Sequence, residues 1–219
     1  MAFIAIYKHH PYCSDDSASG FKIAMGDYHL CVYIDEKDID IDILNHFDMV
    51  VFPGGVGDSD IFDSLLTDKI QIITQYVKDG GKYLGICMGA YWAGSNYFNL
   101  FNGVDAVQYI KQPEAQKRRS YGTVVNVEWN GNEEEMYFYD GCTFKSTPNN
   151  PNVFDGEVIA CYSGNVLYPA AIIQGNVGAI GPHPESLDYW YDTWSYMPRC
   201  WHEGRHHKLL REFVKKLLG

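Results

Sequence analysis

The first half of the chain alternates short apolar runs with segments of helical periodicity. Continuous apolar runs are typical of strands that are covered on both faces of a parallel sheet. Such runs occupy residues 2–6, 29–34, 49–52 and 83–86. Between them, apolar positions recur every three or four residues over 60–78, and Gly80 and Gly81 follow as a helix stop. With a shorter helix over 39–47, this order predicts a parallel sheet with helices on both sides.

The second half has a different pattern, in which short strands are separated by turn residues. Residues 122–129 and 134–139 flank the turn Asn130-Gly131-Asn132, which favours a β-hairpin. Further strands are predicted at 158–162, 170–173 and 177–180, and a loop at 147–151. Residues 205–218 place apolar side chains on one face and predict a closing amphipathic helix. No repeat or long linker interrupts the pattern, so we expect one domain over residues 1–219.

Composition and charge exclude several classes of protein. The formal net charge of −11 argues against a nucleic-acid-binding surface, and the one basic cluster, residues 117–119, is short. No apolar run approaches the roughly 20 residues that cross a bilayer, and the N-terminal pattern is that of a strand, not of a signal peptide. The six cysteines form no Cys-x-x-Cys pair, which indicates reduced thiols and a cytoplasmic location.

The strongest chemical signal is a cysteine at the end of the fourth apolar run. In residues 83–90 (YLGICMGA), Cys87 is bracketed by Gly85 and Gly89, the pattern of a nucleophile elbow between a strand and a helix. The glycines permit close approach of strand and helix, and the helix N-terminus favours a thiolate. The alternative is a buried core cysteine in a glycine-rich turn.

A cysteine nucleophile needs a base and a group that orients that base. Residues 181–185 (GPHPE) place His183 and Glu185 two positions apart after a predicted strand, so that both side chains project to the same side. His183 would accept the thiol proton and Glu185 would hold its tautomer. A proline-stiffened surface loop is the alternative for this segment.

The glycine-rich loop at residues 52–58 (FPGGVGD) follows the third predicted strand and reaches the same sheet edge as Cys87. Backbone N–H groups of Gly55 and Met88 would then meet at a developing oxyanion. The loop after the first strand, with His9 and His10, also reaches this edge, where it lines the site or is solvated. The aromatic segment 188–196 is interpreted as a pocket wall, a subunit contact or plain packing.

One competing motif is present near the C-terminus. Residues 202–206 (HEGRH) match His-Glu-x-x-His, the helix of zinc proteases. Gly204 weakens a helix by about 1 kcal/mol, and few residues follow from which a third ligand could come. We therefore expect a polar helix start, with no metal and no cofactor.

Cys87, the segment 183–185 and the loop 53–55 together resemble the class I glutamine amidotransferase superfamily. Residues 85–94, 139–142 and 169–185 are also similar to the domain found at the N-terminus of eukaryotic biotin-protein ligases and in stand-alone proteins. The resemblance runs from residue 3 to residue 185. It implies a flavodoxin-like α/β three-layer sandwich, with a mainly parallel sheet and extra antiparallel strands in the second half. No biotin-ligase catalytic sequence follows, so biotin transfer is not implied.

The resemblance implies Cys87, His183 and Glu185 as catalytic residues, and Gly55 and Met88 as the oxyanion hole. Substrate contacts are expected from a further set: Gly54, Tyr91, His10 and Tyr139.

Glutamine amidotransferases commonly have Gly-His-Gln after the nucleophile, whereas this chain has Gly89-Ala90-Tyr91, which puts glutamine itself in doubt as the substrate. We therefore expect a cysteine-dependent amidase or glutaminase-like hydrolase acting on a small-molecule amide through an acyl-enzyme. A separate synthetase that takes the ammonia, and a homodimer, stay open as partners. The alternative function is a ligand-binding or regulatory module without turnover.

Overall fold

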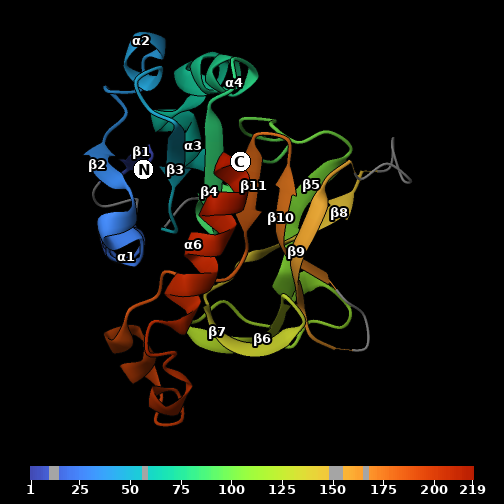
Figure 1. The fold of residues 1–219 in the computed structure, drawn as a ribbon. Coiled ribbons are helices and arrows are strands. Elements are labelled where there is room, and N and C mark those ends of the chain that lie inside the picture. The colour runs from blue at the N-terminus through green and yellow to red at the C-terminus, as the bar shows by residue number, and fades with distance from the viewer. Residues whose placement is uncertain (10–14, 56–58, 148–154, 165–167) are drawn as a thin grey trace.

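The computed structural model describes residues 1–9, 15–55, 59–147, 155–164 and 168–219. In these ranges a nine-stranded sheet has the order β2-β1-β3-β4-β11-β10-β9-β6-β7 (Figure 1). The first five strands in that order run parallel, and the pairs from β11 to β7 are antiparallel. The strands are β1 (Phe3–Tyr7), β2 (Leu30–Ile34), β3 (Met49–Phe52), β4 (Lys82–Ile86), β6 (Thr123–Trp129), β7 (Asn132–Phe138), β9 (Glu157–Tyr162), β10 (Tyr168–Gln174) and β11 (Val177–Ile180).

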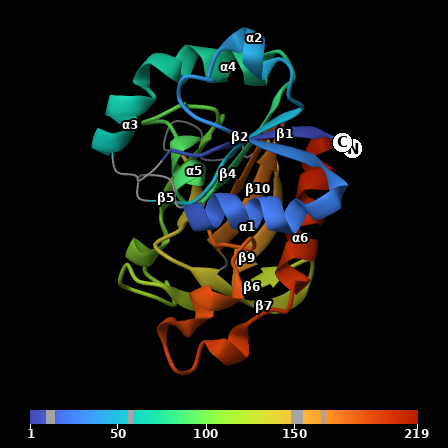
Figure 2. The same cartoon turned by 90° about the vertical axis from the view of Figure 1, so that its left-hand side faces the viewer.

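Helices cover both faces of the parallel half. One face carries α1 (Asp15–Met25) and α6 (Arg205–Leu218), which pack against each other (Figure 2). The other face carries the remaining helices, α2 (Ile41–Leu44), α3 (Ser59–Leu65), α4 (Ile70–Lys78) and α5 (Met88–Trp92). The predicted three-layer α/β architecture is therefore confirmed.

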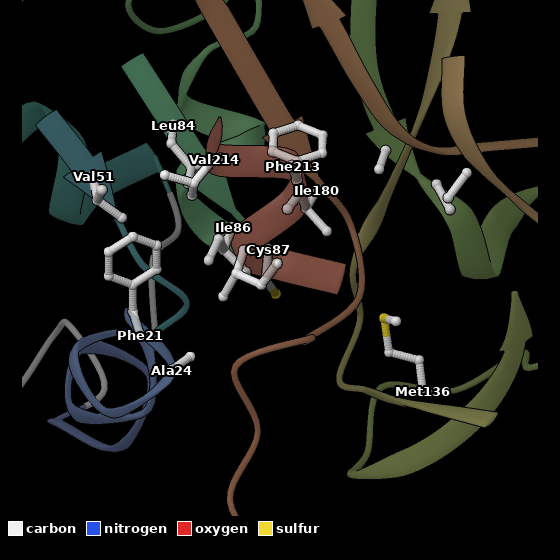
Figure 3. Packing of buried hydrophobic residues seen from close by; sticks show 14 of the residues in the cluster. Phe21, Ala24, Val51, Leu84, Ile86, Cys87, Met136, Ile180, Phe213 and Val214 are labelled. Carbon is white, nitrogen blue, oxygen red and sulfur yellow. The ribbon is translucent and has the colours of Figure 1, made fainter. Parts of the chain in front are cut away.

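The period-two alternation of the strands separates two buried clusters. Ile4 and Ile6 of β1 face α1 and α6, whereas Ala5 and Tyr7 of the same strand face the opposite helices. Figure 3 shows the first cluster, in which Phe21 of α1 and the side chains of α6 meet the middle of the sheet. Burying both faces explains why these strands are continuous apolar runs.

The closing helix has the predicted bounds, and its apolar face is buried as expected. Leu210, Phe213, Val214 and Leu217 all lie in the core. The predicted hairpin is also present, with β6 and β7 paired antiparallel from Thr123 opposite Phe138 to Trp129 opposite Asn132. Of the loop predicted at 147–151, all but Thr147 lies outside the described residues.

Several elements differ from the sequence prediction, and the helix predicted over 39–47 is shorter, Ile41–Leu44. The single helix over 60–78 is divided into α3, a 3₁₀ turn (Thr67–Lys69) and α4, because Leu66 leaves the helical region with φ −127° and ψ −6°. Thr and Asp compete with helical backbone bonding, which favours a break there. Helix α1 was not predicted. A second, two-stranded antiparallel sheet of β5 (Val104–Gln108) and β8 (Cys142–Ser146) was not predicted either.

Short 3₁₀ turns make up the rest of the regular structure: η1 (Gly26–Tyr28), η3 (Tyr109–Lys111), η4 (Asp188–Thr193) and η5 (Pro198–Cys200). Within the described ranges, no helix combines the length and the apolar character that a membrane crossing requires.

Candidate active site

Cys87 sits on a sharp turn between β4 and α5. Its backbone has φ 50° and ψ −102°, a conformation that L residues rarely adopt and that costs about 1–3 kcal/mol. A Cβ on Gly85 would lie 2.3 Å from the carbonyl oxygen of Gly89, and a Cβ on Gly89 would lie 1.9 Å from that of Phe52. Neither position can hold a larger residue without moving backbone. The strand, turn and helix therefore have the geometry of an elbow.

His183 and Glu185 form a buried hydrogen-bonded pair just after β11. The Nδ1–H of His183 donates to Oε1 of Glu185 at 2.8 Å, and the two residues are 4% and 0% exposed. The backbone N–H of His183 donates to the carbonyl of Tyr137 at 2.8 Å, which ties the segment to β7. The geometry fixes which imidazole nitrogen carries the proton, so Nε2 is the atom left for chemistry.

The electrostatics of His183 favour its charged form. Burial by itself lowers the pKa of the ring, but the negative charges of Glu185 and of the Cys87 sulfur outweigh it and raise that pKa to about 10. A protonated imidazole therefore stands beside Cys87 at neutral pH.

Ser17 is a site residue that the sequence did not reveal. It lies in the first turn of α1, where its hydroxyl donates to Oε1 of Glu185 at 2.6 Å and accepts from the N–H of Gly54 at 2.8 Å. A Cβ on Gly20, one turn further along α1, would lie 2.3 Å from the carbonyl oxygen of Glu185. Helix α1 thus packs directly on the acid of the pair and links it to the glycine loop.

A cavity of about 460 Å³ opens over Cys87 and His183. Its described lining consists of Asp16, Ser17, Gly55, Cys87, Tyr137, Tyr139, His183, Tyr189, Trp190 and Thr193. The aromatic segment around η4 therefore forms part of a pocket wall, one of the interpretations that the sequence left open.

The other predicted site residues lie at different distances from this cavity. Gly54 packs on His183, since a Cβ there would lie 2.5 Å from ring atom Cε1. Met88 opens α5, where a helix leaves N–H groups without intrahelical partners. Tyr139 lines the cavity, and its carbonyl oxygen lies 3.4 Å from the sulfur of Cys87.

Two predicted substrate contacts are not placed at the cavity. Tyr91 is not part of the lining, and its hydroxyl donates to the carbonyl of Asp140 at 3.1 Å. His10 lies outside the described residues.

The two histidines of the His-Glu-x-x-His match form hydrogen bonds with a backbone carbonyl and with a carboxylate. His202 precedes α6, and its Nε2 donates to the carbonyl of Ser186 at 3.2 Å, as does Nε2 of His207 at 3.0 Å. His206 donates to Oε2 of Glu134 at 3.1 Å. No group of three or more potential metal ligands occurs within the described ranges. His202 and His207 instead hydrogen-bond the backbone of Ser186, the residue that follows Glu185.

Comparisons with known proteins agree with this architecture. The sequence model of the family described as biotin-protein ligase, N terminal, matches residues 19–112. The biotin–protein ligase of Schizosaccharomyces pombe is 28% identical in an alignment of 165 residues that covers 63% of this chain and 25% of the ligase. The chain thus spans about a quarter of the length of that relative.

Solved structures with the same fold include several amidotransferases. A glutamine amidotransferase from Thermotoga maritima aligns with a TM-score of 0.67 and 15% identity, over 99% of this chain and 97% of that one. PurLQS from the same organism aligns with a TM-score of 0.66 and 15% identity, over 99% and 100%. A putative GMP synthase protein from Thermoplasma acidophilum has a TM-score of 0.61 and 17% identity, over 99% and 94%. The chain therefore has the class I glutamine amidotransferase fold, and its resemblance to the N-terminal domain of biotin-protein ligases is confirmed.

Proposed function

We propose that this protein is a cysteine-dependent hydrolase that cleaves a carboxamide through an acyl-enzyme. One observation supports this function above the others. Cys87, on a strained elbow, shares a cavity with His183, whose ring is oriented by the buried carboxylate of Glu185. A nucleophile, a base and an orienting acid in contact are the arrangement that acyl transfer requires.

The first half of the reaction forms a thioester. His183 holds the proton of Cys87 on Nε2, and the resulting thiolate attacks the carboxamide carbon while the carbonyl electrons move to oxygen. Backbone N–H groups of Met88 and Gly55 stabilise that oxyanion, a contribution worth about 10²–10³ in rate for one donor in a hydrolase. His183 then donates its Nε2 proton to the departing nitrogen, the C–N bond breaks, and ammonia or an amine leaves.

The second half regenerates the enzyme. His183, now neutral, accepts a proton from water while the water oxygen attacks the thioester carbon. The C–S bond breaks, the carboxylic acid leaves, and the proton on His183 returns the site to its starting state. Glu185 keeps Nδ1 protonated throughout, so Nε2 stays the reacting nitrogen.

A synthetase that receives the ammonia is the partner we propose. The support comes from two proteins of the same fold, PurLQS and the putative GMP synthase protein. The position that carries the glutamine-binding amide in true amidotransferases is Tyr91 here, and its hydroxyl is occupied by the carbonyl of Asp140. This difference supports an amide other than glutamine.

The decisive experiment measures ammonia release from a panel of primary amides. We expect Cys87→Ala to reduce release to the uncatalysed background and His183→Ala to reduce it by about 10²–10⁴. Cys161→Ala is the matched control, since Cys161 is a half-buried free cysteine on β9, away from the cavity lining. Release that survives in Cys87→Ala would contradict the mechanism.

A module without turnover predicts a different result. It would release no ammonia from any amide, and iodoacetamide would alkylate Cys87 no faster than the other cysteines. A hydrolase predicts fast alkylation of Cys87 that slows in His183→Ala.

A further inference from the structure

The cavity over Cys87 is walled largely by aromatic rings. Tyr137 and Trp190 pack edge to face at 5.1 Å, and Trp190 packs in the same way on the ring of His183 at 5.5 Å. Tyr139 and Tyr189 stand at the rim, 51% and 49% exposed. The faces of such rings carry negative electrostatic potential, which attracts cations and ammonium groups.

The fixed charge of the cavity is also negative. Among its described lining residues, Asp16 is the one charged side chain outside the Cys87–His183 pair. Its Oδ1 accepts from the hydroxyl of Tyr189 at 2.5 Å, which holds the carboxylate at the rim. An incoming carboxylate therefore meets repulsion at this rim.

No described lysine or arginine offsets that charge in the cavity lining. Lys8 pairs with Asp15 at 3.4 Å, and both Lys8 and Lys22 lie over the ring of Tyr33, at 4.9 and 4.6 Å from its centroid. Among the described lining residues, a free α-carboxylate, as in glutamine, would therefore meet no lysine or arginine.

We propose that the substrate is a cationic carboxamide without a free carboxylate, whose ammonium group lies between the aromatic rim and Asp16. The amide chemistry rests on the proposed function, whereas the charge preference rests on the cavity itself. Trp190, Tyr189 and Asp16 are then the residues that determine specificity.

Thiol probes of different charge test the preference without any turnover. Three methanethiosulfonates serve: the cationic trimethylammonium-ethyl, the neutral methyl and the anionic sulfonatoethyl reagents. In each case the Cys87 sulfur attacks the sulfenyl sulfur, a disulfide forms, the S–SO₂ bond breaks and methanesulfinate leaves. Peptide mass spectrometry follows the rate at Cys87, and each rate is divided by that of 2-mercaptoethanol with the same reagent. We expect a cationic-to-anionic ratio of about tenfold from combined ring and carboxylate contacts.

Matched variants separate the pocket from the overall charge. Asp16→Asn should lower the ratio about threefold, the effect of one exposed ion pair, whereas Asp15→Asn makes the same charge change outside the cavity and should leave it unaltered. Trp190→Ala should slow the cationic reagent about threefold relative to the neutral one. Trp194→Ala, an exposed tryptophan that does not line the cavity, should not.

A wild-type ratio of one or less, or equal ratios in the two aspartate variants, would overturn the proposal. Turnover gives a separate test with four amides: 4-aminobutanamide, butanamide, glutaramate and glutamine. We expect kcat/KM to be highest for 4-aminobutanamide and lowest for glutaramate, and the reverse order would refute the proposal. If none of the four releases ammonia, the proposed function fails for this class of amide, while the probe series still decides the charge preference.

Discussion

Replacing Ser17 with alanine tests whether α1 holds the His183–Glu185 pair in place. The change removes the 2.6 Å bond to Glu185 and the acceptor of the Gly54 N–H at once, both in a buried position. A hydrogen bond to a charged group is worth about 1.5–3 kcal/mol, and a buried N–H left without an acceptor costs about 1–3 kcal/mol. Because the two effects share one hydroxyl and are not fully additive, we expect a loss of about 3 kcal/mol.

Equilibrium urea unfolding measures this loss as a change in the free energy of unfolding. The matched control is Ser95→Ala, which removes a hydroxyl that donates to the carboxylate of Asp105 at 2.5 Å in an exposed position. Water replaces that bond, so the control should lose less than about 1 kcal/mol. Equal losses of unfolding free energy in the two variants would show that burial does not strengthen the Ser17 hydrogen bonds as expected.

Two other predictions concern the elbow and acid stability. Gly89→Ala drives a Cβ into the Phe52 carbonyl and should lower the free energy of unfolding by about 3 kcal/mol or more in the same urea assay; a neutral effect would contradict the elbow geometry. Burial lowers the pKa of His202 to about 2 and that of His206 to about 3, so their contribution is complete above pH 6.5 and is lost as the pH falls below it. We expect a loss of roughly 1.4 kcal/mol per histidine for each pH unit, and a flat profile from pH 7 to 5 would refute it. The pKa of His183 is raised, so its contribution is full below pH 6.5 and declines as the pH rises from there toward 10.

The sequence predicts the parallel half of the fold well because both faces of its strands are buried. Strand β3, a run of four apolar residues, has the predicted bounds, and so does α6 with its single apolar face. Helix α1 escaped prediction because its start, Asp-Asp-Ser-Ala-Ser-Gly, has the composition of a loop. Its polar and small residues contact Glu185, which is distant in the sequence, so the local sequence pattern does not indicate that contact.

The candidate site likewise contains residues that the sequence predicts and residues that it does not. Cys87, His183 and Glu185 could be located because each stands in a local motif with a chemical meaning. Ser17 could not, since an isolated serine gains its role only from a partner 168 residues away. Likewise, the rim that Asp16 and Tyr189 form joins the first helix to the late aromatic segment, and the sequence offers no sign of that contact.

The order of these residues along the chain has a consequence for synthesis. The elbow of Cys87 is built from β3, β4 and α5, all of which precede residue 93. The strand that leads to His183 and Glu185 is β11, and it enters the sheet between β4 and β10. A nascent chain therefore carries its cysteine through the synthesis of a further 96 residues, from Cys87 to His183, before the base and its acid are made. Until then the thiol has no proton acceptor, so an incomplete chain lacks a catalytic site. The edge of β4 is also unpaired, so such a chain is prone to form non-native strand pairing along that edge.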